Sequence, residues 1–65
     1  MMDLIEDRNL HDHDGFYAEL LAAHQGLTDD QCQALNAQLV LILANHIGNR
    51  TVLSQALALA RRNLR

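Results

Sequence analysis

The sequence predicts an all-α fold in which three helices form one small domain. Three observations favour it: proline is absent from the 65 residues, only three residues are glycine, and apolar residues recur at the spacing of amphipathic helices. The helices are expected at about residues 15–25, 29–47 and 50–63. Residues 1–13 lack this periodicity and predict a flexible acidic arm, so the single helical domain should span residues 14–65.

The first helix is expected to follow Asp14, whose carboxylate can accept a hydrogen bond from a free amide of the first turn. Phe16, Leu20 and Ala23 then fall on one side of the helix and give it an apolar face. Gly26 is the expected stop, because glycine adopts the left-handed conformation at little steric cost.

The start of the second helix carries the clearest local signal in the chain. Thr28 and Gln31 have the spacing of a capping box, in which each side chain satisfies the backbone amide of the other residue. Asp29 and Asp30 suit the positive end of the helix dipole. We therefore expect a helix that begins after Thr28 and stops at Gly48.

The third helix is expected to begin after Asn49, a favourable N-cap residue. Its apolar residues occupy one half of the circumference. Three arginines, Arg61, Arg62 and Arg65, complement the negative C-terminal end of the helix dipole. The turns between the helices are very short, which favours antiparallel or sharply crossed neighbours.

The second helix contains six apolar residues in a row, 39–44, which cover every side of a helix because successive side chains are offset by about 100°. A helix that is apolar all round must be enclosed, so this long central helix is expected to be the most buried. In so short a chain the flanking helices can cover only one side of it. That side should carry Cys32, Leu35, Leu39, Ile42, Leu43 and His46.

The opposite side of this helix combines small residues with one leucine and suits the close approach of another helix. We interpret it as an interface, with a second copy in a homodimer or with a partner protein, in which the amide of Asn36, Gln38 or Asn45 could fix the pairing. The residues predicted to form it are Ala34, Ala37, Leu41, Ala44 and Asn45. The alternative is an exposed alanine-rich face with one stray leucine.

Charge is segregated along the chain. All eight acidic residues lie at or before Asp30, whereas four of the five arginines follow it. This segregation favours attraction between the two ends, within one chain or between two, although solvated charged faces are the commoner alternative. The net charge of −3 argues against nucleic acid as the partner.

The composition also bears on cellular location. Cys32 is the only cysteine, which fits a reducing compartment. No apolar stretch approaches the roughly 18 residues of a membrane span, and the acidic N-terminus argues against a signal peptide. We therefore expect a cytoplasmic protein that has no membrane partner.

No catalytic signature stands out, so the sequence predicts neither an enzyme nor a bound cofactor. His11, His13 and His46 could meet around a metal if the first two helices were antiparallel, although no family spacing of zinc ligands is present. A nucleophilic pair of Cys32 with a histidine is disfavoured, because this cysteine lies on the apolar stripe and is expected to act as a small buried hydrophobe.

Three segments together resemble a small bacterial family, a domain of unknown function of about this length. They are residues 16–27 (FYAELLAAHQGL), 34–39 (ALNAQL) and 43–48 (LANHIG), and the resemblance covers about residues 14–62. Members of that family are often encoded near flavin-dependent aromatic hydroxylases. The resemblance therefore implies an accessory role beside such an enzyme and assigns no functional residue.

The leading hypothesis is a non-catalytic helical protein–protein interaction module. The first alternative is a small metal- or ligand-binding protein that uses His11, His13 and His46. The second is a helix-turn-helix DNA-binding regulator with arginines of the third helix on phosphates. Recognition helices contact bases with their N-terminal residues, whereas these arginines cluster at the C-terminal end, which counts against a regulator.

Overall fold

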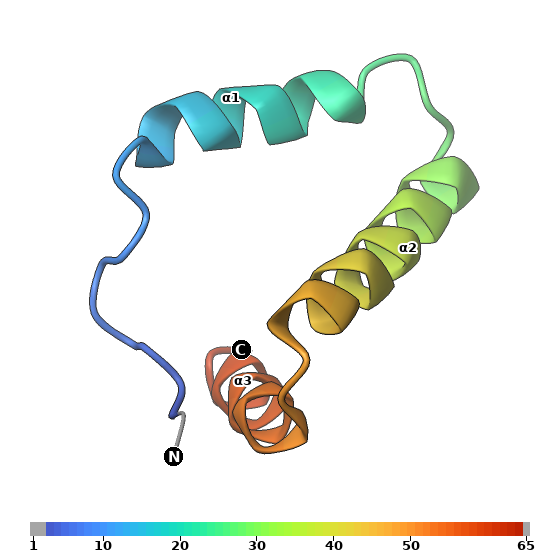
Figure 1. The fold of residues 1–65 in the computed structure, drawn as a ribbon. Helices are drawn as coiled ribbons and strands as arrows, with labels where there is room; N and C mark the ends of the chain where they lie inside the picture. Colours follow the sequence, from blue (N-terminus) through green and yellow to red (C-terminus); the bar gives the residue numbers. More distant parts are fainter. Residues whose placement is uncertain (1–2, 65) are drawn as a thin grey trace.

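The computed structural model describes residues 3–64, which form an extended arm followed by three helices (Figure 1). The helices are α1 (His13–Ala23), α2 (Asp29–Ile47) and α3 (Arg50–Arg62). The all-α class and the three helices are therefore confirmed. The first two residues of the predicted arm, Met1 and Met2, and the last predicted arginine, Arg65, lie outside the described residues.

The N-cap of α1 is Asp12, so the prediction that Asp14 caps this helix is wrong. An oxygen of the Asp12 side chain, Oδ1, accepts a hydrogen bond from the backbone N–H of Gly15 at 3.0 Å. A Cβ atom at position 15 would collide with the Asp12 carboxylate, so glycine leaves the room that this cap needs. The helix ends at Ala23, before the predicted residue 25, and Gly26 follows in the left-handed region at φ 75°.

The predicted boundaries of α2 are confirmed, together with its capping box. The backbone N–H of Gln31 donates to the Thr28 hydroxyl oxygen at 3.2 Å, and the Thr28 N–H donates to Oε1 of Gln31 at 3.0 Å. At the other end, Gly48 adopts the left-handed conformation with φ 64°, and its N–H donates to the carbonyl oxygen of Ala44 at 2.9 Å. Both ends of α2 are thus fixed by local side-chain and backbone chemistry.

Replacing Thr28 with alanine is expected to lower the free energy of unfolding by about 1 kcal/mol, because the cap of α2 loses its side-chain acceptor. Urea unfolding followed by circular dichroism measures this loss. Thr51→Ala is the matched control, since Thr51 lies exposed in the first turn of α3 and does not cap it. Equal effects of the two substitutions would contradict the role of the capping box.

Asn49 caps α3 as predicted, with its Oδ1 accepting a hydrogen bond from the backbone N–H of Val52 at 3.0 Å. The helix ends at Arg62, one residue before the predicted end, and Arg61 and Arg62 lie in its last turn. The positive charges therefore sit at the negative end of the helix dipole, where they are favourable.

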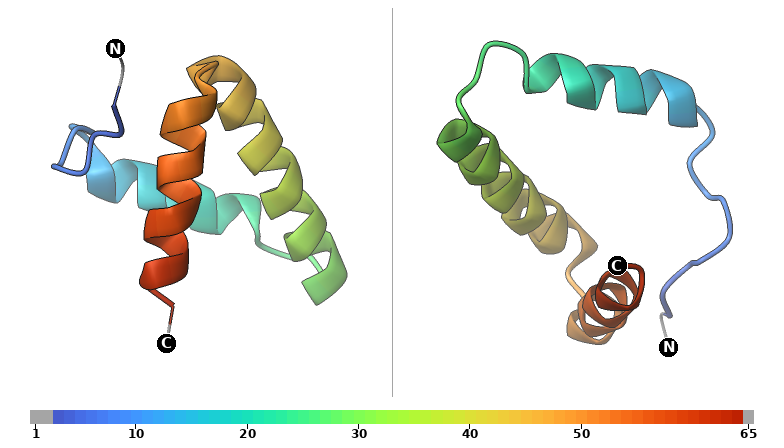
Figure 2. Two further views of the ribbon diagram at one scale, coloured as in Figure 1. Left: turned by 90° about the horizontal axis from the view of Figure 1, so that it is seen from below. Right: turned by 180° about the vertical axis from the view of Figure 1, so that it is seen from behind.

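The three helices do not close around a core. Figures 1 and 2 show α1 and α2 diverging from the turn that joins them, α2 and α3 forming a V, and the arm returning towards α3. The chain has a radius of gyration of 13.5 Å, whereas a compact domain of this length has about 11 Å. The chain is consequently less compact than a closed domain of this length.

The open arrangement makes the prediction of a buried central helix wrong for the single chain. No residue of α2 is buried, and among the described hydrophobic side chains only Val52 of α3 is, at 6% exposure. Ile42, which was expected to face the other helices, is 63% exposed. The physical reason is that α1 and α3 each meet α2 near one of its ends. Within residues 3–64, no helix combines the length and the apolar character that crossing a membrane requires.

Candidate interaction surface

His24 holds the corner between α1 and α2. Its Nδ1–H donates to the carbonyl oxygen of Leu20 at 2.7 Å, and its Nε2 lies 2.9 Å from the side-chain amide of Asn36 on α2. The atom of Asn36 in this contact is its side-chain oxygen, Oδ1. Asn36 therefore pairs within the chain, where the sequence had suggested pairing across an interface.

Apolar side chains line a small groove beside this corner. Phe16 and Leu20 of α1 and Leu35 and Leu39 of α2 bound a volume of about 150 Å³. Leu20, Leu35 and Leu39 are half-buried there. Cys32 is also half-buried, and its Sγ lies 4.0 Å from the His24 carbonyl oxygen. The predicted core-facing stripe of α2 thus meets α1 only through its N-terminal half.

The predicted interface on α2, hereafter the outer face, is open to solvent over most of its area. It consists of Ala34, Ala37, Leu41, Ala44 and Asn45, of which Ala44 is half-buried and the other four are exposed. Leu41 is 70% exposed, more than any other leucine or isoleucine of α2. A large apolar side chain thus stands among small ones, a surface on which another helix can lie closely.

A second, mostly apolar surface of α2 runs from the contact with His24 to the groove beside α3, and we call it the inner stripe: Asn36, Val40, Leu43 and Ile47. These positions are spaced i, i+4, i+7 and i+11, so they share one side of the helix. The stripe starts at Asn36, which pairs with α1, and ends at Ile47, which lines a groove with the arm and Val52 of α3. Val40 and Leu43 therefore lie between α1 and α3, and both are exposed.

The exposure of the inner stripe does not follow from helical periodicity, which places Leu43 on the side expected beneath the other helices. The signal in the sequence that could have predicted this exposure is the apolar content of this side of α2. It is greater than two short helices can cover. Leu43 and Val40 are the functional candidates that this reasoning adds.

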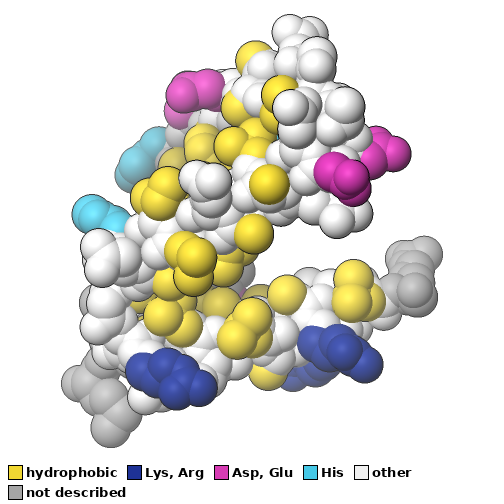
Figure 3. All heavy atoms as spheres, turned by 90° about the vertical axis from the view of Figure 1, so that its right-hand side faces the viewer, with side chains coloured by type: hydrophobic (Ala, Val, Ile, Leu, Met, Phe, Trp, Pro, Cys, Tyr) yellow, Lys and Arg dark blue, Asp and Glu magenta, His cyan; other side chains and the backbone are white. Residues whose placement is uncertain are grey.

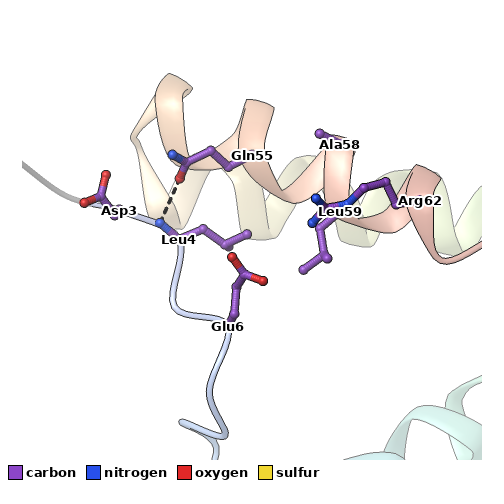
Figure 4. A pocket seen from close by; sticks show the side chains of 7 residues that line it. All are labelled: Asp3, Leu4, Glu6, Gln55, Ala58, Leu59 and Arg62. Carbon is purple, nitrogen blue, oxygen red and sulfur yellow. Dashed lines mark hydrogen bonds between the residues drawn. The ribbon is translucent and has the colours of Figure 1, made fainter.

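The arm contacts α3 over a second small pocket. The backbone N–H of Leu4 donates to Oε1 of Gln55 at 2.9 Å, as Figure 4 shows. The pocket has a volume of about 300 Å³ and is lined by Asp3, Leu4, Glu6, Gln55, Ala58, Leu59 and Arg62. Arg62 thus shares its surroundings with two acids, so this side of α3 is a surface of mixed charge, unlike the uniformly basic patch of a nucleic-acid-binding domain.

The candidate metal ligands are not brought together. Within residues 3–64, no three side chains of the histidine, cysteine, aspartate or glutamate type are placed to hold a metal ion. His46 lies near the arm as expected, and it lines a groove of about 400 Å³ with Asp3, Leu4, Ile5, Asn9, Ile47 and Val52. His11 and His13 are absent from that lining, because α1 and α2 diverge and are not antiparallel (Figure 1).

Comparisons with known proteins identify the family of this chain. No curated protein and no solved structure matches the chain. A family model described as "Protein of unknown function (DUF2783)" matches residues 4–62, which include most of the arm as well as all three helices. The family pattern thus begins earlier than residue 14, where the sequence analysis placed its start. The chain belongs to this family of small proteins of unknown function.

Proposed function

We propose that this chain is a non-catalytic helical protein–protein interaction module, which binds a partner protein through the outer face of α2. The observation that carries the proposal is the exposure of Leu41, 70% of whose surface is open to solvent among small residues. Burying a leucine of this kind against a partner contributes about 2 kcal/mol. The small neighbours let the partner approach the helix closely.

The placement of the nucleophilic and basic groups supports a role without a chemical step. Both ring nitrogens of His24 are engaged by Leu20 and Asn36, and Cys32 faces the His24 carbonyl oxygen. No cysteine–histidine pair of the kind that activates a nucleophile is formed by these two side chains. The two groups act in holding α1 on α2.

A flavin-dependent aromatic hydroxylase is the partner that we propose to test first, in a bacterial cytoplasm. The reason is the resemblance of about residues 14–62 to a family often encoded near such enzymes. The tagged chain would be used to capture proteins from the native cell extract, with mass spectrometry to identify them. The affinity of the purified partner would then be measured directly.

Leu41→Glu is expected to weaken partner binding by about 30- to 100-fold, because a charge replaces the apolar anchor at the centre of the outer face. Circular dichroism should show unchanged helix content, since Leu41 makes little contact within the chain. Ser54→Glu, an exposed position on α3, is the control and should bind as the native chain does. Native affinity of the Leu41→Glu variant would assign the partner to another surface.

A further inference from the structure

The accessible surface of the chain is far larger than its mass requires. The chain of 7.3 kDa exposes 6134 Å², whereas a compact monomer of this mass exposes about 4,200 Å². The excess is about 2,000 Å², and an obligate homodimer buries about 1,000–2,500 Å² on each protomer. The exposed excess is thus of the size that a second copy covers.

Exposed apolar side chains cluster around a hollow in the molecule. Figure 3 shows a hollow between the upper part of the molecule and α3 below it, with hydrophobic side chains on both walls. On α2, Val40 of the inner stripe is 60% exposed and Leu43 is exposed as well. Leu43 faces away from Leu41, since the two lie about 160° apart round the helix, whereas Val40 borders the outer face beside Ala44.

The wall contributed by α3 is a stripe at the same helical spacing. Leu53, Leu57 and Ala60 lie on one side of the helix, opposite the side that meets the arm through Gln55, Ala58, Leu59 and Arg62. Leu57 is 67% exposed. Neither the arm nor α2 covers this side of α3 near its C-terminal end, so it is free to meet another molecule.

The distribution of charged side chains indicates which molecule could bind in the hollow. Acids lie on the arm, where Asp3 and Glu6 are beside Arg62, on α1 and in the first turn of α2, whereas all charged side chains described on α3 are arginines. Figure 3 shows these two signs on opposite sides of the hollow. An occupant that carries both signs in the opposite order would complement both walls. A second copy turned by a two-fold axis does so, since its basic α3 then meets the acidic α1 and α2 start of the first copy.

We propose that this chain forms a two-fold symmetric homodimer in which each copy places α3 in the hollow of the other. The contact joins the inner stripe of α2, around Val40 and Leu43, to Leu57 of α3. This inference deepens the proposed function and rests on it, since the dimer leaves the outer face of α2 free and presents two such faces to a partner protein.

Sedimentation equilibrium tests the dimer on the full chain. The native protein is expected at twice its 7.3 kDa mass. Leu43→Glu and Leu57→Glu should each raise the dimer dissociation constant at least about 100-fold, because each buries an uncompensated charge in the contact. Leu41→Glu is the matched control, with the same change on the other side of α2, and should remain dimeric.

Each outcome decides the inference. A native chain of single mass at every concentration overturns it, and so does a dimer that Leu41→Glu dissociates while Leu57→Glu does not. If Leu43→Glu loses its helical circular dichroism, Leu57→Glu alone decides, since Leu57 is largely free of contacts within the chain. If the chain is a monomer and still captures a partner protein, only the dimer is overturned. If the chain is a dimer and captures no partner protein, only the proposed function is overturned.

Discussion

Replacing Val52 with aspartate is expected to lower the free energy of unfolding by about 3 kcal/mol or more, since a carboxylate would lie without a partner in an apolar site. Val52 is the one buried hydrophobic residue among those described, at 6% exposure. It lines a groove with Leu4 and Ile5 of the arm and with Ile47 at the end of α2. A domain of 65 residues has only about 3–10 kcal/mol to lose.

The Val52→Asp variant should lose structure locally before the whole chain unfolds. The arm is expected to detach first, because its contact with α3 depends on the apolar groove and on the single hydrogen bond from the Leu4 N–H to Gln55. Hydrogen exchange at the Leu4 amide measures this detachment, and urea unfolding measures the total loss. Ser54→Asp places the same carboxylate on an exposed position of α3 and should cost less than about 0.5 kcal/mol. Similar losses in the two variants would show that Val52 is not buried in solution.

Features that depend on neighbours in the sequence were predictable in this chain. The capping box of Thr28 and Gln31 and the N-cap Asn49 each need only a spacing of three residues, and the structure confirms them. The N-cap of α1 was missed because Asp12 and Asp14 both have the right chemistry. Only Asp12 is followed three residues later by a glycine, Gly15, which leaves space for the capping carboxylate.

Features that depend on the angle between helices were not predictable. Leu43 and Ile42 were expected beneath the other helices, because helical periodicity tells which side chains share a side but not how far a neighbour extends along it. The contact of Leu4 with Gln55 joins residues 51 positions apart and leaves no local signal in the sequence. The candidate surfaces followed from the sequence only in part: Leu41 was found, and the inner stripe was not.

The turn between α2 and α3 contains a left-handed residue, Gly48, and replacing it gives the second large effect. Gly48→Val is expected to lower the free energy of unfolding by about 2 kcal/mol, because the left-handed conformation is costly for a β-branched residue. Gly48 has φ 64°, and its N–H donates to the Ala44 carbonyl oxygen at 2.9 Å. A Cβ atom there would meet only the Asn45 carbonyl oxygen, at 3.7 Å, so the cost arises from the backbone and not from a clash.

The Gly48→Asn variant distinguishes the cost of the left-handed backbone from the cost of a side-chain clash. Asparagine is larger than glycine but tolerates the left-handed region, so this variant should lose less than about 1 kcal/mol in the same urea unfolding. The valine variant should in addition lose amide protection at position 48, because a backbone that leaves the left-handed region withdraws its N–H from Ala44. Equal losses for valine and asparagine would mean that the turn has no left-handed residue in solution. The V between α2 and α3, and with it the hollow on which the dimer depends, would then have a different shape.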